Sequence, residues 1–232
     1  METAGPSQIF IVSGPSGSGK TSIVEHLLRG LPNTVFSVSY TTRAPRAGEQ
    51  EGRDYRFVSR EVFEARLALG EFLEHADVFG NLYGTHRSAL AEAERQGKDL
   101  LLDIDVEGAG QVKARFPEAV AILVLPPSWQ ELERRLRARG LDRPEMIQRR
   151  LERARQEIEN YKTYDYVVVN RALAETCAQV EAIVVAARHP QAGGRPASPA
   201  VQEAEARAAA ARKEVNLGQV SAILETFGAQ RP

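Results

Sequence analysis

Short, strongly apolar runs alternate along the chain with longer stretches in which apolar residues recur every three or four positions. The first pattern is typical of buried strands and the second of amphipathic helices. The strand pattern occurs at 8–13, 99–104, 119–125 and 166–169, with a shorter and more polar run at 35–39. Because the two patterns alternate, we predict an α/β fold in which helices flank a central, mostly parallel sheet.

The predicted helices have recognisable ends. We expect helices at 19–28, 60–69, 88–96 and 129–139, and a glycine follows each of the last three. Ser128 and Glu131 form a capping box at the start of the fourth. A longer helix begins at Pro144. The last helix of the core carries Cys177 on its apolar stripe, which favours a small core residue over a reactive thiol.

The composition changes after residue 187. Residues 188–202 are rich in Pro, Gly and Ala and have no apolar period, which predicts a flexible linker. Residues 203–215 are Ala-rich and predict a helix, and an amphipathic stripe follows at 217–227. We therefore expect a folded domain up to residue 187, followed by a linker and a helical C-terminal extension.

Composition narrows the class of protein. Of the 232 residues, 43% are hydrophobic and 26% are charged, and the net charge of −1 argues against a dedicated nucleic-acid or anionic-membrane binder. The apolar runs are far shorter than the ~18–20 residues that cross a bilayer, and the N-terminus lacks the pattern of a secretory signal. The single Cys177 allows no internal disulfide, so we expect a cytoplasmic protein.

Residues 14–21 carry the most specific chemical signal, because they satisfy the phosphate-binding pattern GxxxxGK[ST] between a predicted strand and a predicted helix. Backbone N–H groups of such a loop face phosphate oxygens. We expect Lys20 to reach the β- and γ-phosphates of ATP and the Thr21 hydroxyl to ligate Mg²⁺. The alternative is a Gly/Ser-rich turn with a surface lysine. The residues expected at ATP are Gly14, Pro15, Ser16, Gly17, Ser18, Gly19, Lys20 and Thr21.

Two carboxylates follow the apolar run at 100–102. Asp103 ends the strand, and we expect Asp105 two residues later on the same strand face. The carboxyl end of a buried strand is where open α/β sheets bind ligands, so Asp103 is a candidate for holding the water shell of Mg²⁺. The alternative is that the two carboxylates cap the next turn through Gly108.

A basic segment is hidden by the overall balance of charge. Residues 131–155 contain nine arginines and five acidic residues, which gives this segment a charge of +4. We expect Arg137 and Arg153 on solvated helix faces. Arg135, Arg139 and Arg150 are candidates for phosphate contacts, because planar guanidinium groups suit the oxygens of a transferring phosphoryl group.

The residues FSVSYTTRAPRAGEQEGRDYRFVS at 36–59 and GNLYGT at 80–85 resemble guanylate kinases strongly. Together with the loop, LLLDIDVEG, RRLRARG and YVVVN, the similarity covers residues 7–187 in order. It implies a P-loop NTPase that transfers the γ-phosphoryl group of ATP to GMP, or to dGMP as an alternative, with Mg²⁺, for GMP salvage and recycling. Neither nucleic acid nor membrane is an expected partner, and the number of subunits is left open.

The resemblance also divides the chain. It implies a core at 7–33, 86–125 and 156–187, an inserted, β-rich GMP-binding subdomain at 34–85, and a helical lid at 126–155. The linker at 188–202 and the extension at 203–232 lie beyond the similarity, and we expect no catalytic role for the extension.

The residues that match GMP-binding positions of the family are Ser39, Arg43, Arg46, Tyr55, Glu74, Tyr83, Thr85 and Asp105. On this match a carboxylate such as Glu74 accepts hydrogen bonds from the N1–H and N2–H₂ donors of guanine, whereas adenine presents an acceptor at N1. Ser39 and Thr85 match contacts to the base. The arginines and tyrosines match a clamp on the GMP phosphate.

The basic segment coincides with the lid of the family, and Asn170 falls where the family contacts adenine. The expected catalytic residues are Lys20, Arg43, Arg135, Arg139 and Arg150. Two rival functions stay open: a non-catalytic guanylate-kinase-like module that binds a protein partner, and a kinase for another nucleoside monophosphate. The intact Lys20 argues against the first, and Glu74 with Ser39 argues against the second.

Overall fold

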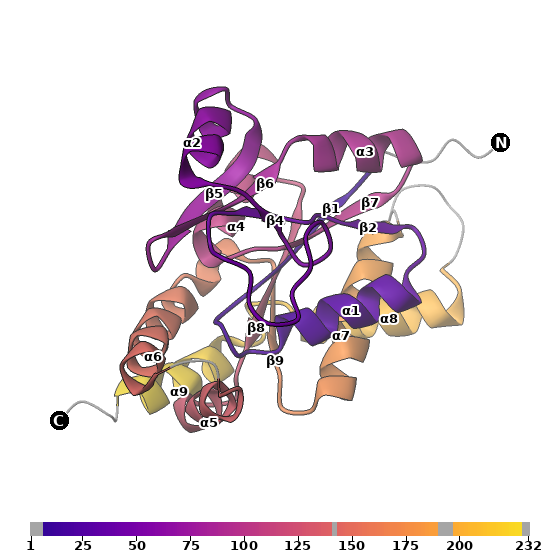
Figure 1. Ribbon diagram of the computed structural model, residues 1–232. Coiled ribbons are helices and arrows are strands. Elements are labelled where there is room, and N and C mark those ends of the chain that lie inside the picture. The colour runs from indigo at the N-terminus through magenta and orange to yellow at the C-terminus, as the bar shows by residue number, and fades with distance from the viewer. Residues whose placement is uncertain (1–6, 141–142, 190–196, 229–232) are drawn as a thin grey trace.

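The computed structural model describes residues 7–140, 143–189 and 197–228, and a parallel five-stranded sheet forms its centre (Figure 1). The strands of this main sheet lie in the order β2-β7-β1-β8-β9. Their bounds are β1 (Ile9–Ser13), β2 (Thr34–Phe36), β7 (Asp99–Asp103), β8 (Val120–Leu125) and β9 (Tyr166–Val169). The five predicted strands are confirmed to within two or three residues at each end, and so is the α/β class.

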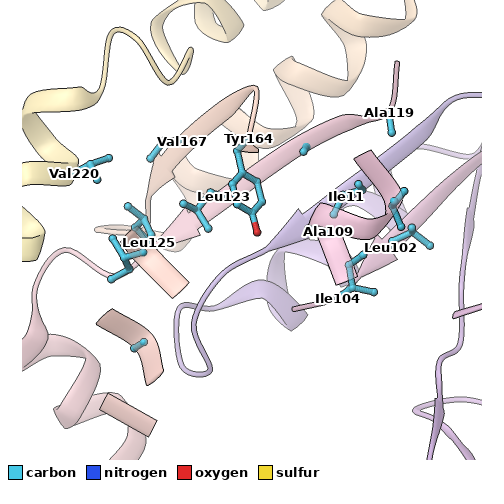
Figure 2. Packing of buried hydrophobic residues seen from close by; sticks show 14 of the residues in the cluster. Ile11, Leu102, Ile104, Ala109, Ala119, Leu123, Leu125, Tyr164, Val167 and Val220 are labelled. Carbon is cyan, nitrogen blue, oxygen red and sulfur yellow. The ribbon is translucent and has the colours of Figure 1, made fainter. Parts of the chain in front are cut away.

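Helices cover both faces of the main sheet, because successive strand residues point to opposite sides. Ile9 and Ile11 of β1 enter one apolar cluster, whereas Phe10 and Val12 enter the other. The second cluster lies under α1 (Lys20–Gly30), α7 (Leu173–Arg188) and α8 (Pro199–Ala210). The first lies under α3 (Ser88–Gln96), α4 (Val106–Arg115) and the helices of the lid described below. Figure 2 shows part of this first cluster around Tyr164 and Leu123.

A second sheet of four strands, in the order β4-β3-β6-β5, is inserted after β2. We call it the small sheet. Its elements are β3 (Tyr40–Thr41), β4 (Arg56–Phe57), α2 (Arg60–Ala68), β5 (Phe72–Val78) and β6 (Asn81–His86). The predicted insertion at 34–85 begins too early, because β2 pairs with β7 in the main sheet. The short, partly polar run at 35–39 predicted this strand but did not show to which sheet it belongs.

Two helices, α5 (Trp129–Ala138) and α6 (Pro144–Glu159), correspond to the predicted lid, and we call them the lid helices. The expected boundary at residue 155 falls inside α6, which continues to Glu159 before a 3₁₀ turn, η1 (Tyr161–Thr163). Residues 141–142 of the lid lie outside the described residues. Across the described ranges, every helix is too short or too polar to traverse a bilayer.

Two local expectations are wrong, and one helix was not expected. Asp105 does not continue the strand: β7 ends at Asp103, and Asp105 caps α4 with its side chain on the Gly108 N–H. Helix α4 itself escaped prediction because two glycines, Gly108 and Gly110, weaken its helical pattern. The linker is shorter than expected, since α7 reaches Arg188 and α8 begins at Pro199, although residues 190–196 lie outside the described part, as does the N-terminus up to residue 6.

The C-terminal extension also differs from its prediction in detail. Helix α8 ends at Ala210, so the expected helix at 203–215 is only partly correct. The chain then runs beside the edge strand β9, where Tyr166 and Arg212 form an antiparallel bridge. The amphipathic stripe at 217–227 is confirmed as α9 (Leu217–Gly228), in which Val220, Ile223 and Phe227 are buried, whereas Leu217 at its start is exposed.

Candidate active site

The loop between β1 and α1 curls tightly at three glycines, Gly14, Gly17 and Gly19, which adopt positive φ angles. A side chain at Gly14 would also collide with the Val124 carbonyl of the neighbouring strand. Lys20 Nζ folds over the loop and donates to the carbonyl oxygens of Gly14 at 2.7 Å and Pro15 at 3.3 Å. The lysine thus lies at the mouth of a phosphate-sized backbone loop at the start of α1.

Asn170 holds the loop from behind. Its side-chain amide donates to the Ser18 carbonyl at 2.7 Å and accepts from the Thr176 hydroxyl at 3.2 Å. Asn170 is buried, and a side chain at Gly19 would collide with its amide nitrogen. The amide therefore fixes the shape of the loop, and its predicted contact with adenine stays a prediction.

The two residues expected at a metal ion flank this loop. Thr21 lies exposed in the first turn of α1, and Asp103 ends β7, directly across from Val12 of β1. Burial holds the pKa of the Asp103 carboxyl above its usual range, while the charge of Lys20 acts in the opposite direction. A hydroxyl and a carboxylate are oxygen ligands of the kind that Mg²⁺ prefers, so the donor set fits a water-rich Mg²⁺ site. The part of the chain that the structure describes holds no cluster of three or more His, Cys, Asp or Glu residues suited to a metal.

The lid helices bring two of the three candidate arginines to the loop. Arg150 Nη1 donates to the Ser16 hydroxyl at 2.7 Å. Arg135 donates to the carbonyl oxygens of Asn170 at 2.9 Å and Ser18 at 3.4 Å. Arg139 caps the end of α5 and is exposed. The lid thus places positive charge against the phosphate-binding loop.

One face of the small sheet gathers the residues expected to read the base. Thr85 of β6 lies opposite Glu74 of β5. The antiparallel pair of β3 and β6 sets Tyr40 opposite Gly84, which brings the preceding Ser39 across from Thr85. Cross-strand neighbours share a face. Three polar side chains from distant parts of the sequence, those of Ser39, Glu74 and Thr85, thus lie in one row.

Glu74 is the most perturbed carboxylate of this row. Only 4% of the residue is exposed, and a side chain at Gly108 of α4 would collide with its carboxylate. Burial raises the pKa of Glu74 to about 7, and the nearby charge of Asp105 acts in the same direction. The neighbouring Thr85 acts in the opposite direction on this pKa, although its hydroxyl makes no hydrogen bond within the described residues. Such a buried, perturbed acid is a marker of a functional site.

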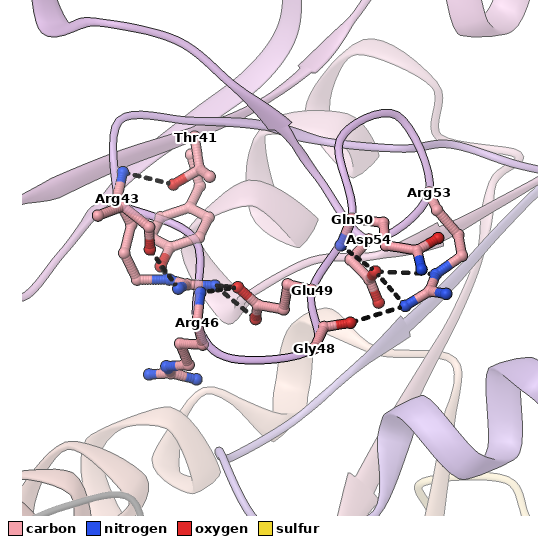
Figure 3. A network of polar contacts seen from close by, with 10 residues as sticks. Thr41, Arg43, Arg46, Gly48, Glu49, Gln50, Arg53 and Asp54 are labelled. Atoms are coloured by element: carbon pink, nitrogen blue, oxygen red, sulfur yellow. Dashed lines mark hydrogen bonds and ion pairs between the residues drawn. The ribbon is translucent and has the colours of Figure 1, made fainter.

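A second polar group lies beside this row, around Arg43 (Figure 3). Arg43 Nε donates to the Tyr83 hydroxyl at 3.0 Å, and Nη2 forms an ion pair with Glu49 at 2.8 Å. The Arg43 guanidinium also lies 5.3 Å from the centre of the Tyr55 ring. Burial and then the charge of Asp103 raise the pKa of Tyr55 to about 12, which keeps its hydroxyl a donor. The guanidinium of Arg46 is exposed and points away from this network (Figure 3).

Arg153 of α6 is a site residue that the sequence did not reveal. It was expected on a solvated face, yet its guanidinium pairs with Asp105 at 2.9 Å and donates to the Asp77 carbonyl at 3.3 Å. It also lies 5.3 Å from the ring centre of Phe79, at the tip of the β5–β6 hairpin. One side chain therefore joins the lid, the cap of α4 and the small sheet. Arg137, in contrast, is exposed and pairs with Glu133, as predicted.

A glycine-rich loop that leads from a central parallel strand into a helix, with its lysine at the mouth, defines a P-loop nucleotide-binding protein of the α/β class. Within that class the small sheet and the lid are the distinguishing parts. The model of the guanylate kinase family matches residues 7–187, and the chain belongs to that family.

Similarity to curated and solved proteins agrees with this membership. The chain is 55% identical over 183 residues to a guanylate kinase of Koribacter versatilis, covering 78% of each chain. It is 52% identical over 167 residues to a guanylate kinase of Thiobacillus denitrificans, covering 72% of this chain and 80% of the relative. A crystal structure of guanylate kinase from Anaplasma phagocytophilum superimposes with a TM-score of 0.68 at 38% identity, covering 80% of this chain and 88% of that one.

Proposed function

We propose that the protein transfers the γ-phosphoryl group of ATP to GMP, giving ADP and GDP. The loop at 14–21 takes the phosphates of ATP, and the row of Ser39, Glu74 and Thr85 takes the guanine base. The observation that carries the proposal is the position of Glu74, a carboxyl that is only 4% exposed and lies opposite Thr85 on the small sheet. Guanine offers two adjacent N–H donors that a carboxylate satisfies in one plane, which would stabilise the ionised form.

The other end of GMP meets the group around Arg43. Arg43 and the Tyr83 hydroxyl beside it offer hydrogen-bond donors to the phosphate. Tyr55, whose ring lies next to Arg43, and the long side chain of Arg46 complete the clamp. Arg43 also forms an ion pair with Glu49, which holds its guanidinium in place beside the Tyr83 hydroxyl. The phosphate is ionised at neutral pH, and the reaction therefore needs positioning rather than a general base.

The ATP side uses charge. Lys20 leaves the carbonyl oxygens of Gly14 and Pro15 to reach the β- and γ-phosphates of ATP. Arg135, Arg139 and Arg150 neutralise the negative charge of the phosphoryl group during its transfer. The lid also excludes water, which would otherwise compete with GMP for the phosphoryl group.

Thr21 and Asp103 would hold Mg²⁺, largely through water. At this position Mg²⁺ would supply positive charge to the phosphates of ATP. We place the reaction in the cytoplasm, where the lone Cys177 stays reduced.

An assay of ADP formation from magnesium-ATP tests this function, with AMP, UMP, CMP, GMP and dGMP offered in turn to the wild-type protein. We expect GMP, or GMP and dGMP, to be phosphorylated far faster than the other acceptors. Preference for another base would overturn the role of Glu74. Activity on none of them would favour the non-catalytic module that binds a protein partner.

A further inference from the structure

The chain beyond residue 187, which the family does not match, folds back onto the kinase domain. Helix α8 packs against α7, and the following residues extend the main sheet at its edge strand. There the Val167 N–H donates to the Ala211 carbonyl at 2.9 Å, and the Lys213 N–H donates to the Asp165 carbonyl at 3.2 Å. This edge pairing carries the chain across to the lid, where α9 lies beside α5 and α6 (Figure 1).

The apolar face of α9 completes the core of the lid. Val220, Ile223 and Phe227 are 1%, 2% and 6% exposed, and they belong to the first apolar cluster. That cluster also contains buried lid residues, namely Leu132, Leu136, Ile147, Leu151, Ala154 and Ile158. Figure 2 shows Val220 in the same cluster as Leu125 and Val167 of the main sheet. The lid helices therefore pack against α9 as well as against the sheet.

A polar contact fixes the start of α5 on α9. The N–H of Trp129, the first residue of α5, donates to the Thr226 hydroxyl oxygen at 2.9 Å. The first N–H groups of a helix have no partner within the helix. The Thr226 hydroxyl supplies one here, and it therefore fixes where α5 begins relative to α9. The Thr226 hydroxyl in turn donates to the Ile223 carbonyl at 2.6 Å, which fixes its own orientation.

The opposite side of the lid rests on the phosphate-binding loop. Besides the contacts of Arg135 and Arg150 with this loop, Gly17 packs directly on α5. A Cβ atom at Gly17 would lie 2.8 Å from Leu132 Cδ1 and 3.2 Å from Leu136 Cδ2. The same two leucines enter the cluster that contains α9. The lid is thus held between α9 on one side and the loop on the other.

We infer that α9 is a positioning element of the kinase, which holds the lid helices so that Arg135 and Arg150 lie at the phosphate-binding loop before ATP arrives. The inference rests on the proposed function. Stabilisation of the transferring phosphoryl group depends on positive groups that are already in the correct position. Small displacements of these groups therefore lower the rate of transfer strongly. Within residues 197–228, the part of the extension that the structure describes, no hydrogen bond or ion pair reaches the phosphate-binding loop, so we assign this part the role of setting the lid and not a part in the chemistry.

A matched pair of cavity variants tests this inference. Ile223→Ala removes three methyl or methylene carbons from the lid side, and Ile183→Ala removes the same atoms from α7, in the cluster on the other face of the sheet. Both should lower the melting temperature. Only Ile223→Ala should raise KM for ATP and lower kcat, each by about threefold to tenfold, while KM for GMP changes less.

Thr226→Val keeps the shape of the side chain and removes the acceptor for Trp129, so it guards against a cavity variant that fails to fold. We expect the same direction of change in KM for ATP, at a smaller size. Hydrogen exchange of the ligand-free protein gives a readout that does not depend on activity. Amides of α5 and α6 should exchange faster in Ile223→Ala and Thr226→Val than in Ile183→Ala.

Kinetics and lid exchange in Ile223→Ala and Thr226→Val that match those of Ile183→Ala would overturn the inference. Failure of the proposed function looks different, because the wild-type protein would then phosphorylate no nucleoside monophosphate, or prefer one other than GMP. In that case hydrogen exchange alone decides whether α9 holds the lid.

Discussion

The two halves of the site, the phosphate-binding loop and the row of Ser39, Glu74 and Thr85, consist of different chemical groups. The phosphate-binding loop consists of backbone N–H groups, glycines and one lysine within eight consecutive residues. The row that we propose to read the base consists of side chains, and Ser39, Glu74 and Thr85 share one face only because three strands pair in one register. Phosphate recognition therefore depends on a local turn, whereas base recognition depends on the fold of the whole small sheet. The substitutions below should separate the two.

The largest expected effect is on the phosphate half. Lys20→Ala should lower kcat by about 10³-fold, because it removes a charge that acts on the transferring phosphoryl group. The melting temperature should change far less than kcat, since the hydrogen bonds of Lys20 go to two loop carbonyls. Lys162→Ala, at an exposed lysine of η1, is the matched control. A Lys20→Ala variant with wild-type turnover would exclude the loop as the ATP site.

The next effect is on the base half. Glu74→Gln should lower kcat/KM for GMP by about 10- to 100-fold, because an amide cannot accept from both guanine donors. KM for ATP should change little. Glu64→Gln, at an exposed ion pair of α2, serves as the control. Unchanged selectivity among nucleoside monophosphates would remove Glu74 from base recognition.

The same substitution should also stabilise the ligand-free protein at alkaline pH. The pKa of Glu74 is raised on folding from its ordinary 4.5 to about 7, so the folded state holds a proton that the unfolded state has lost. Stability consequently falls as pH rises between these values. At pH 8 Glu74→Gln should melt at a higher temperature than the wild type, and at pH 4 the difference should shrink. A lower melting temperature at pH 8 would mean that the buried charge is not a cost to the ligand-free fold.

GMP affinity should depend on pH through the same group. With a pKa of about 7, Glu74 is mostly protonated at pH 6 and mostly ionised at pH 8, so GMP should bind roughly tenfold more weakly at pH 6. The GMP phosphate also titrates in this range. Affinities of the wild type and of Glu74→Gln, measured by calorimetry across these pH values, isolate the contribution of Glu74. A constant ratio between the two proteins would exclude it.

The smallest effect is expected at Arg153, which links the lid to Asp105 and to the β5–β6 hairpin. Arg153→Gln should lower kcat/KM by about threefold to tenfold, because Asp105 and the β5–β6 hairpin lose their link to the lid. Arg155→Gln is the control, since Arg155 lies on the same helix and pairs with Glu159. If both variants matched the wild type, the Arg153 contact would have no role in turnover.

What the sequence revealed follows the same division. The loop at 14–21 and the strand that precedes it are local, so spacing alone located them. The row of Ser39, Glu74 and Thr85 became visible only through resemblance to a family, because no local pattern states which strands will pair. Arg153 escaped because its position in α6 has the spacing of an exposed arginine, and only tertiary packing brings Asp105 within reach.

The fold shows the same limit. Strongly apolar runs such as 166–169 located their strands accurately, whereas β2, at the edge of the main sheet, was placed in the wrong subdomain. The docking of α9 could not be read from its amphipathic stripe, since such a stripe fits any apolar partner. That α9 packs on the lid helices becomes visible only in the folded molecule.

The most direct test of the division is calorimetry of GMP binding in the absence of ATP, with wild-type protein, Lys20→Ala and Glu74→Gln at pH 8. The account predicts that Lys20→Ala binds GMP within about twofold of the wild type, while Glu74→Gln binds it at least about tenfold more weakly, a loss of about 1.4 kcal/mol. Equal weakening in both variants, or wild-type affinity in Glu74→Gln, would contradict it.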